Sequence, residues 1–345
     1  MGVESLAKSL NADWSSIWNA AKESDAQRNR LKDIVDREKI DSSDISVVVF
    51  GSLARREWTS GSDLDWTLLI DGEADHEHAN TAHRLRSVLE EEKFQNPGAT
   101  ETFGTLTFSH DLVHQIGGLD DSNRNTTRRL LMLLESMPAS RRDAYGRVVR
   151  GILRRYLEND YRDFRLKVPR FLLNDFHRYW RTICVDYASK YRDQAAKKWG
   201  LRNVKLRLSR KLIFAAGVLS CFRCDPGWIA IDAPDLAKTP DVDGLVEYME
   251  KLIGQTPLDI IASVLEKFGD KTAAGHIFNS YNDFLEKLDN PSIRKHLEKL
   301  KPENAKDDSI FQEMMVLSES FELGLERLFF DNDAMDLLTK KYGVF

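Results

Sequence analysis

The stretch FGSLARREWTSGSDLDWTLLID, residues 50–71, decides the fold. It overlaps the end of ISVVVFG (45–51), a β-branched apolar run that predicts a buried strand ending in glycine. LARREW (53–58) predicts one or two helical turns, and TSGS (59–62) predicts a tight turn. DLDWTLLID (63–71) then predicts a second buried strand that begins with two aspartates. The predicted order is strand, Gly-Ser, short helix, turn and strand.

The two aspartates of the second strand predict a metal site. Residues two apart in a strand point to the same face, so Asp63, Asp65 and Thr67 share one side. Carboxylates within about 7 Å of each other repel and gain proton affinity unless a cation lies between them. Oxygen ligands of this kind suit Mg²⁺, which completes its octahedron with water and substrate phosphates. We expect two Mg²⁺ ions here, with Mn²⁺ as a substitute.

The Gly-Ser pair ahead of the aspartates predicts a phosphate site. Gly51 allows a tight turn after the first strand. Ser52 offers a hydroxyl, and the amides at the following helix start are donors for a phosphate. Together with Asp63 and Asp65, these residues predict a site for one nucleoside triphosphate with its metal.

The rest of the chain predicts an α+β fold followed by helices. Helical periodicity at 3–38 and 78–94 and a third strand region at 104–116 complete a compact mixed α/β unit. From Thr126 onward the pattern is almost wholly helical, and 224–244 is a Pro/Gly/Asp-rich connector. The predicted divisions are a core with an N-terminal helix (1–125), a basic helical nucleotide- or acceptor-binding domain (126–223) and an acidic helical region (224–345).

Composition predicts a soluble protein. Of its 345 residues 42% are hydrophobic and 30% charged, and no apolar run approaches the length of a membrane span. The first thirty residues are polar and mixed in charge, unlike a signal peptide. A cytoplasmic location without a membrane partner is therefore expected. Cys221 and Cys224 form CFRC without a second Cys or His pair nearby, which favours two small core residues over a zinc site.

Charge is segregated along the chain. Residues 121–211 hold 24 Lys and Arg against 9 Asp and Glu, although the whole chain has a net charge of −5. Such a basic segment attracts polyanions, so a phosphorylated ligand or acceptor is expected there. The alternative is a solvated basic helical face.

The opening stretch resembles the signature of the DNA polymerase β-like nucleotidyltransferase superfamily, in which a strand ending in Gly-Ser precedes an Asp-x-Asp strand. The likeness is clear over residues 45–72. DLVHQIGGLDDSNRNTTRRLLMLLES (111–136) resembles bacterial uridylyl- and adenylyltransferases. The helical segments up to about residue 220 are similar to bacterial stand-alone nucleotidyltransferases, some of them associated with anti-phage defence.

The resemblance implies transfer of a nucleotidyl group to a hydroxyl, with Asp63 and Asp65 as metal ligands and pyrophosphate as the leaving group. The superfamily usually adds a third carboxylate from a neighbouring strand. If 105–111 is continuous strand, Asp111 joins the pair as ligand or base, and Glu101 and Asp120 are the alternatives.

Cations must stabilise the developing charge of pyrophosphate. The basic helical segment offers five candidates as phosphate contacts, with a surface salt bridge as the alternative for each: Arg178, Arg181, Lys205, Arg210 and Lys211.

The acceptor is the open question. The basic segment disfavours a cationic antibiotic and favours a phosphate-rich acceptor, so synthesis of an oligonucleotide or nucleotide signal is expected, with single-stranded nucleic acid as product or acceptor and a partner effector protein. Transfer to a protein hydroxyl is the alternative, including self-modification at Tyr342 in the terminal TKKYGVF. A silent nucleic-acid-binding module is the non-enzymatic alternative.

Overall fold

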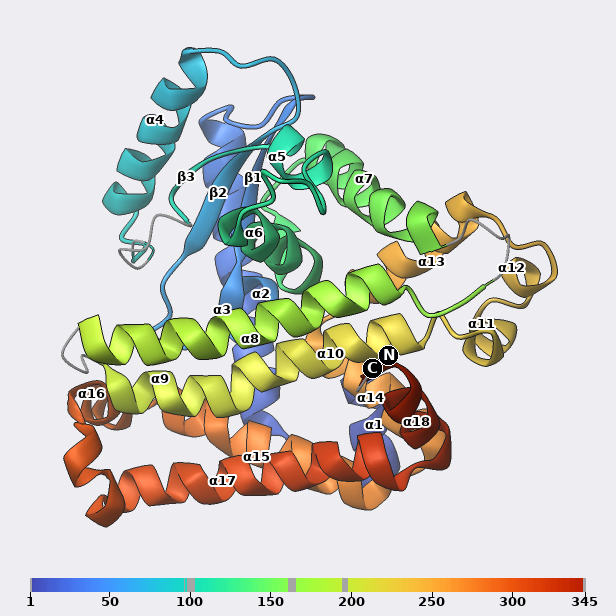
Figure 1. The fold of residues 1–345 in the computed structure, drawn as a ribbon. Helices are drawn as coiled ribbons and strands as arrows, with labels where there is room; N and C mark the ends of the chain where they lie inside the picture. The colour runs from blue at the N-terminus through green and yellow to red at the C-terminus, as the bar shows by residue number, and fades with distance from the viewer. Residues whose placement is uncertain (1, 96, 98–102, 161–165, 194–197, 344–345) are drawn as a thin grey trace.

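The computed structural model describes residues 2–95, 97, 103–160, 166–193 and 198–343 (Figure 1). Its sheet has four strands in the order β3-β2-β1-β4. The strands are β1 (Ile45–Phe50), β2 (Asp65–Ile70), β3 (Thr105–Phe108) and β4 (Ser136–Pro138). β1 runs antiparallel to β2 and β4, whereas β2 and β3 are parallel. The result is the small mixed sheet that the sequence predicts.

The strand register brings three chain segments to one corner of the sheet. Phe50, the last residue of β1, pairs with Asp65 on one side and with Ser136 on the other. Gly51 and Glu135 are the residues that adjoin Phe50 and Ser136 in the chain. The start of β2 therefore lies beside the Gly-Ser turn and the start of β4.

Helices cover both faces of the sheet (Figure 1). Leu31, Leu85 and Leu89 pack with Val47 and Leu68 on one face, which α2 and α4 cover. α5, α6 and α7 pack on the other face. The bounds of these N-terminal helices are α1 (Gly2–Leu10), α2 (Ser15–Arg37), α3 (Gly51–Ala54), α4 (Glu77–Glu91), α5 (Ser109–Val113), α6 (Asn123–Leu134) and α7 (Asp143–Asp160).

The remaining described residues are helical. These elements are α8 (Arg170–Asp193), α9 (Trp199–Lys205), η1 (Leu206–Arg210), α10 (Lys211–Phe222), α11 (Pro226–Asp232), α12 (Pro234–Lys238), α13 (Val242–Ile253), α14 (Pro257–Phe268), α15 (Lys271–Asp289), α16 (Pro291–Lys299), η2 (Pro302–Asp307), α17 (Ser309–Glu326), η3 (Arg327–Asp331), α18 (Asp333–Leu338) and η4 (Thr339–Gly343). α9, η1 and α10 follow one another without a break, with a π-helical turn at η1. α1 packs on α14 and α2 on α15, so the N-terminal helices share a core with the C-terminal helical region.

The structure confirms the fold class and corrects several predicted elements. The helix expected over 3–38 is interrupted between α1 and α2, where Asn11 has a φ of 50°. The third strand is only four residues long, because the chain turns into α5 at Ser109. The connector at 224–244 contains α11 and α12. β4 was not predicted, since three residues ending in proline carry too little strand pattern.

The segregated charges pair across the fold. Arg142 and Arg150 of α7 form ion pairs with Glu250 of α13 at 3.2 Å and 2.7 Å. Arg147 contacts Asp71 at 2.7 Å and Asp44 at 3.2 Å. These arginines therefore hold the acidic C-terminal helices and the sheet against α7.

No single helix among the described residues is both long and apolar enough to cross a membrane. Two consecutive helical segments, Trp199–Phe222 and Pro226–Asp232, together have the length and composition of a membrane span, but the chain bends by 87° between them. Cys221 and Cys224 of this region are fully buried with free thiols, as their reading as core residues predicts.

The contact of α17 with α15 makes a stability prediction. A Cβ added at Gly324 would lie 2.6 Å from Cγ1 of Ile277 and 3.0 Å from the backbone oxygen of Ala273. We expect Gly324→Ala to lower the free energy of unfolding by about 1–3 kcal/mol, because the backbone contact cannot yield easily. Urea denaturation measures this change.

Gly275→Ala is the matched control. Gly275 is also helical, and its nearest heavy atom to an added Cβ is Nδ2 of Asn279 at 3.9 Å. This substitution should leave stability unchanged or raise it by up to about 1 kcal/mol through helix propensity. Equal losses from the two variants would contradict the packing argument.

Candidate active site

A polar cavity of about 130 Å³ opens at the sheet corner where β1 ends and β2 begins. The core contributes the Gly-Ser turn, the following loop and both aspartates. The helical region contributes basic, polar and apolar side chains from α9, η1, α15 and α16. The lining residues are Gly51, Ser52, Arg55, Glu57, Thr59, Ser62, Asp63, Asp65, Lys205, Ser209, Arg210, Phe284, Leu285, Leu288 and Arg294.

Asp63 and Asp65 both line this cavity. Within the described residues neither carboxylate forms an ion pair or a hydrogen bond with a neighbouring side chain. Burial, together with the charge of Asp63, raises the pKa of Asp65 above the usual carboxyl range. Two unpaired carboxylates that line one cavity are donors of the kind that a divalent cation requires.

Gly51 is required where it stands. Its φ of +70° lies in the left-handed region, and an added Cβ would be 3.2 Å from Oδ2 of Asp65. A side chain here would be strained and would also crowd the carboxylate. Glycine therefore lets the Gly-Ser turn and Asp65 approach each other closely.

Three cationic side chains face the aspartates: Lys205, Arg210 and Arg294. Burial and the charge of Arg294 lower the pKa of Lys205 to about 8. Arg294 packs on the backbone of Gly61, where an added Cβ would lie 2.5 Å from its Nε. These cations come from α9, η1 and α16, so the helical region supplies positive charge to the cavity that both carboxylates line.

Glu135 holds two of the basic side chains in place. It is 3% exposed, and its carboxylate accepts hydrogen bonds from Arg210 at 2.8 Å and from Arg55. Arg55 also donates to Glu57 at 2.8 Å. The backbone oxygen of Glu135 accepts a hydrogen bond from the amide of Gly51 at 3.2 Å. One buried residue thus connects the phosphate turn, the short helix after it and η1.

The C-terminal helices close another side of the cavity. The amide and hydroxyl of Ser60 donate to Asp289 at the end of α15, at 2.8 Å and 2.9 Å. This contact fixes the turn that precedes Asp63. Phe284 and Leu288 of α15 form the apolar part of the lining. Sequence reasoning found no chemistry in the acidic region and therefore missed Arg294 and this wall.

The structure does not bring the expected third carboxylate to the pair. β3 runs parallel to β2 with Phe108 opposite Ile70, five residues beyond Asp65, which is about 16 Å along a strand. Asp111 follows this end in α5, beside Arg128 rather than beside Asp65. The prediction failed because the strand stops at Phe108. Asp120 is exposed and does not line the cavity, and Glu101 lies outside the described residues.

Lys205 and Arg210 line the cavity as expected, but the other predicted phosphate contacts do not. Arg178 donates to Oδ1 of Asn123 at 2.9 Å, and Arg181 is exposed on α8. Lys211 forms an ion pair with Glu322 at 2.9 Å and lines a different cavity. Arg210 and Lys211 follow each other along one continuous helix, and neighbouring residues of a helix point in different directions. Arg210 therefore lines the cavity with the aspartates, whereas Lys211 lines the other one.

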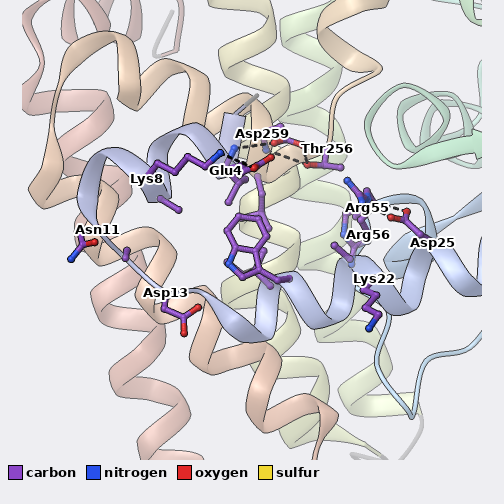
Figure 2. Close-up of a pocket in the computed structure, with 17 residues that line it drawn as sticks. Glu4, Lys8, Asn11, Asp13, Lys22, Asp25, Arg55, Arg56, Thr256 and Asp259 are labelled. Atoms are coloured by element: carbon purple, nitrogen blue, oxygen red, sulfur yellow. Dashed lines mark hydrogen bonds and ion pairs between the residues drawn. The ribbon is translucent and has the colours of Figure 1, made fainter.

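A larger cavity, about 840 Å³ in volume, lies on the other side of Arg55 (Figure 2). It opens between α1, α2 and the start of α14. Its charged groups largely pair with one another: Lys8 with Glu4 at 2.9 Å, and Arg56 with Asp25 at 2.5 Å. Because it holds neither aspartate of the pair, it is not the site of the predicted chemistry.

Comparison with known protein families points to the segment that contains the Gly-Ser turn and the two aspartates. Residues 28–99 match the family model of the nucleotidyltransferase domain, a segment that includes β1, the Gly-Ser turn and both aspartates. No curated protein and no solved structure matches the chain significantly. The chain thus carries a nucleotidyltransferase domain and is a transferase of nucleotidyl groups, for which a nucleoside triphosphate is the substrate.

Proteins with this type of domain generally use divalent metals, and the residues present fit one. Asp63 and Asp65 offer unpaired oxygen donors at one cavity. No cluster of three or more His, Cys, Asp and Glu side chains suited to a metal occurs in the described ranges. Two carboxylates are sufficient for Mg²⁺, which keeps water and substrate phosphates as its other ligands.

Lys205 makes a pH prediction. A lysine with a pKa near 8 is charged at pH 7 and neutral at pH 9.5, so affinity for a polyanion should fall as pH rises through 8. We expect metal-free ATP in EDTA to bind the wild type about tenfold more weakly at pH 9.5 than at pH 7. Calorimetry measures the two affinities.

Lys205→Arg tests the assignment, because arginine stays charged throughout this range. Its affinity for ATP should change less than about twofold between the two pH values. An equally steep fall in this variant would show that another group titrates.

Glu135 makes a prediction about positioning. Glu135→Gln removes the charge that pairs with Arg210 and Arg55, and breaking a buried pair should cost about 3–5 kcal/mol of stability. With Arg210 released, KM for the triphosphate should rise at least about tenfold. Steady-state kinetics and urea denaturation measure the two effects.

Glu57→Gln is the comparison variant, since it weakens Arg55 but leaves the pair of Glu135 with Arg210. It should lose stability with a much smaller rise in KM. If KM followed stability equally in both variants, Glu135 would have a purely structural role.

Proposed function

We propose that the protein is a Mg²⁺-dependent nucleotidyltransferase that moves a nucleoside monophosphate from a nucleoside triphosphate to a hydroxyl acceptor, with release of pyrophosphate. The observation that carries this proposal is the placement of Lys205, Arg210 and Arg294 opposite the unpaired carboxylates of Asp63 and Asp65. A triphosphate with its metal complements this cavity, because the positive metal is a partner for the aspartates and the negative phosphates are partners for the three cations.

Each group of residues has a distinct task in this proposal. Ser52 and the amides that follow Gly51 bind phosphate oxygens at the start of α3. Lys205, Arg210 and Arg294 bind the leaving pyrophosphate and balance its growing charge. Asp63 and Asp65 hold the metal, which when bound activates the acceptor oxygen and stabilises charge on the phosphates. Glu135 keeps Arg210 directed at the cavity.

For the acceptor we propose a nucleotide or oligonucleotide, made into a nucleotide signal in bacterial defence. The likeness of the helical segments to stand-alone nucleotidyltransferases associated with anti-phage defence supports this choice. The basic segment supports it less than its charge suggests, because Arg142, Arg147 and Arg150 are engaged in ion pairs. The cations at the cavity itself remain as its support.

Transfer to a protein hydroxyl is the second candidate. Tyr342 does not line the catalytic cavity, and the ammonium of Lys341 lies 4.9 Å from the centre of its ring. Self-modification would therefore take place between two copies of the chain. An intact mass that rises by one nucleotide in the wild type but not in Tyr342→Phe would support this candidate.

Substitution of the aspartate pair tests the proposal. Asp63→Asn and Asp65→Asn should each lower Mg²⁺-dependent pyrophosphate release by about a thousandfold or more, because an amide is a poor metal ligand. Asp65→Asn should also stabilise the fold by roughly 1 kcal/mol, since it removes a repelled charge. A coupled pyrophosphate assay and thermal unfolding measure these changes.

Asp111→Asn is the control, and it should retain activity within about twofold if the carboxylate acts only beyond the far end of β2. Release that persisted without the aspartate pair would refute the metal site. Absence of release in the wild type, with nucleic-acid binding retained, would favour the silent binding module.

A further inference from the structure

The outer face of α17 and η3 carries a regular set of exposed apolar side chains. Val316, Leu323 and Phe330 are 63%, 45% and 56% exposed. They are spaced seven residues apart on a helix that runs from α17 directly into η3. Within α17 a spacing of seven keeps Val316 and Leu323 on one helical face, as in the seam of a coiled coil. Phe330 follows in η3, a π-helical turn, and lines the cavity beside this face. The opposite face, with Met314 and Phe321, is buried against the protein.

Acidic side chains alternate with these apolar ones. Glu319 and Glu326 lie three residues after Val316 and Leu323, and both are exposed. In the described part of the chain neither has an assigned ion pair or hydrogen bond. The exposed face therefore has the order Val316, Glu319, Leu323, Glu326 and Phe330, which we call the C-terminal seam. Single exposed apolar residues are ordinary, but a row at heptad spacing indicates an interaction surface.

An apolar cavity lies next to the end of the C-terminal seam. It has a volume of about 290 Å³ between α8, α10, α17 and η3, and Phe330 and Glu326 are part of its lining. The rings of Trp180 and Phe214 stack in it with their centres 5.3 Å apart. Such a cavity can receive a large apolar side chain from a helix that lies along the seam.

We propose that the C-terminal seam binds a basic amphipathic helix of another protein. A partner helix with apolar residues at heptad spacing would cover Val316, Leu323 and Phe330. Lysine or arginine between them would pair with Glu319 and Glu326, for which the described residues provide no ion-pair partner. A second copy of the same seam fits poorly, because it would place glutamates against glutamates.

A synthetic helix tests the complementarity directly. The probe is a fluorescently labelled three-heptad peptide with Leu at the seam-facing apolar positions and Lys between them. Its binding to the full chain is measured by fluorescence anisotropy at 50 mM and 500 mM NaCl. We expect saturable binding that weakens at least about tenfold at the higher salt, because screening reduces the charge pairing.

Variants on the seam separate this site from general stickiness. Leu323→Arg should weaken binding at least about tenfold. Glu319→Lys with Glu326→Lys should do the same for the Lys peptide and should create binding of a peptide that has Glu in place of Lys. Ile231→Arg is the matched control, since Ile231 is 67% exposed on α11 outside the seam and should have no effect.

Two results would overturn the proposal. The first is no binding by the wild type, or equal binding of both peptides by the wild type and the charge-reversed variant. The second is a wild-type dimer in light scattering that Leu323→Arg converts to monomer, which would assign the seam to a second copy. Pyrophosphate release and the unfolding temperature should be unchanged in all variants, because the substituted side chains are exposed and outside the catalytic cavity.

Discussion

The repulsion between the carboxylates of Asp63 and Asp65, at the start of β2, is the constraint around which the neighbouring charges are arranged. Burial and the charge of Asp63 raise the pKa of Asp65, so cations nearby are needed to stabilise its ionised form. Lys205 at the end of α9 and Arg210 at the end of η1 provide them, and Glu135 in turn neutralises Arg210 and Arg55 within the protein. The result is alternating charge from the cavity inward, in which each ion has a counter-ion. A bound metal and triphosphate would extend the same alternation outward.

This arrangement explains why the site needs the helical region. The matched domain, residues 28–99, contains the aspartates and the phosphate turn but none of Lys205, Arg210 or Arg294. Glu135 also lies beyond it, although its backbone bonds to Gly51. Because the counter-charges come from segments far along the chain, the aspartates and the cations that line their cavity are assembled only when both parts of the chain fold together.

How much of this could be read from the sequence depended on the range of the interaction. Gly51, Ser52, Asp63 and Asp65 form a local motif whose spacing specifies its geometry, and the structure places them at one cavity. Asp111 was misplaced because four residues decide where β3 ends, and strand ends are set by tertiary packing. Glu135 gave only a weak signal, a single acid after an apolar run. Arg294 gave none, because its contact with Gly61 joins residues more than two hundred positions apart.

The segregated charge of the sequence has a similar explanation. A net positive segment between acidic ends suggests a surface for polyanions. In the folded protein, however, acidic residues of the C-terminal helices pair with this segment: Glu250 of α13 with Arg142 and Arg150 of α7, and Glu322 of α17 with Lys211. Charge segregation along a sequence can therefore reflect ion pairing between segments of the same chain as well as binding of a charged ligand. What remains unpaired after folding is more informative. At the catalytic cavity these groups are the aspartates and Lys205, and on α17 they are Glu319 and Glu326. Each set lies beside an opening in the protein and forms no ion pair within the described residues, so the charge of an incoming molecule can be inferred from these groups.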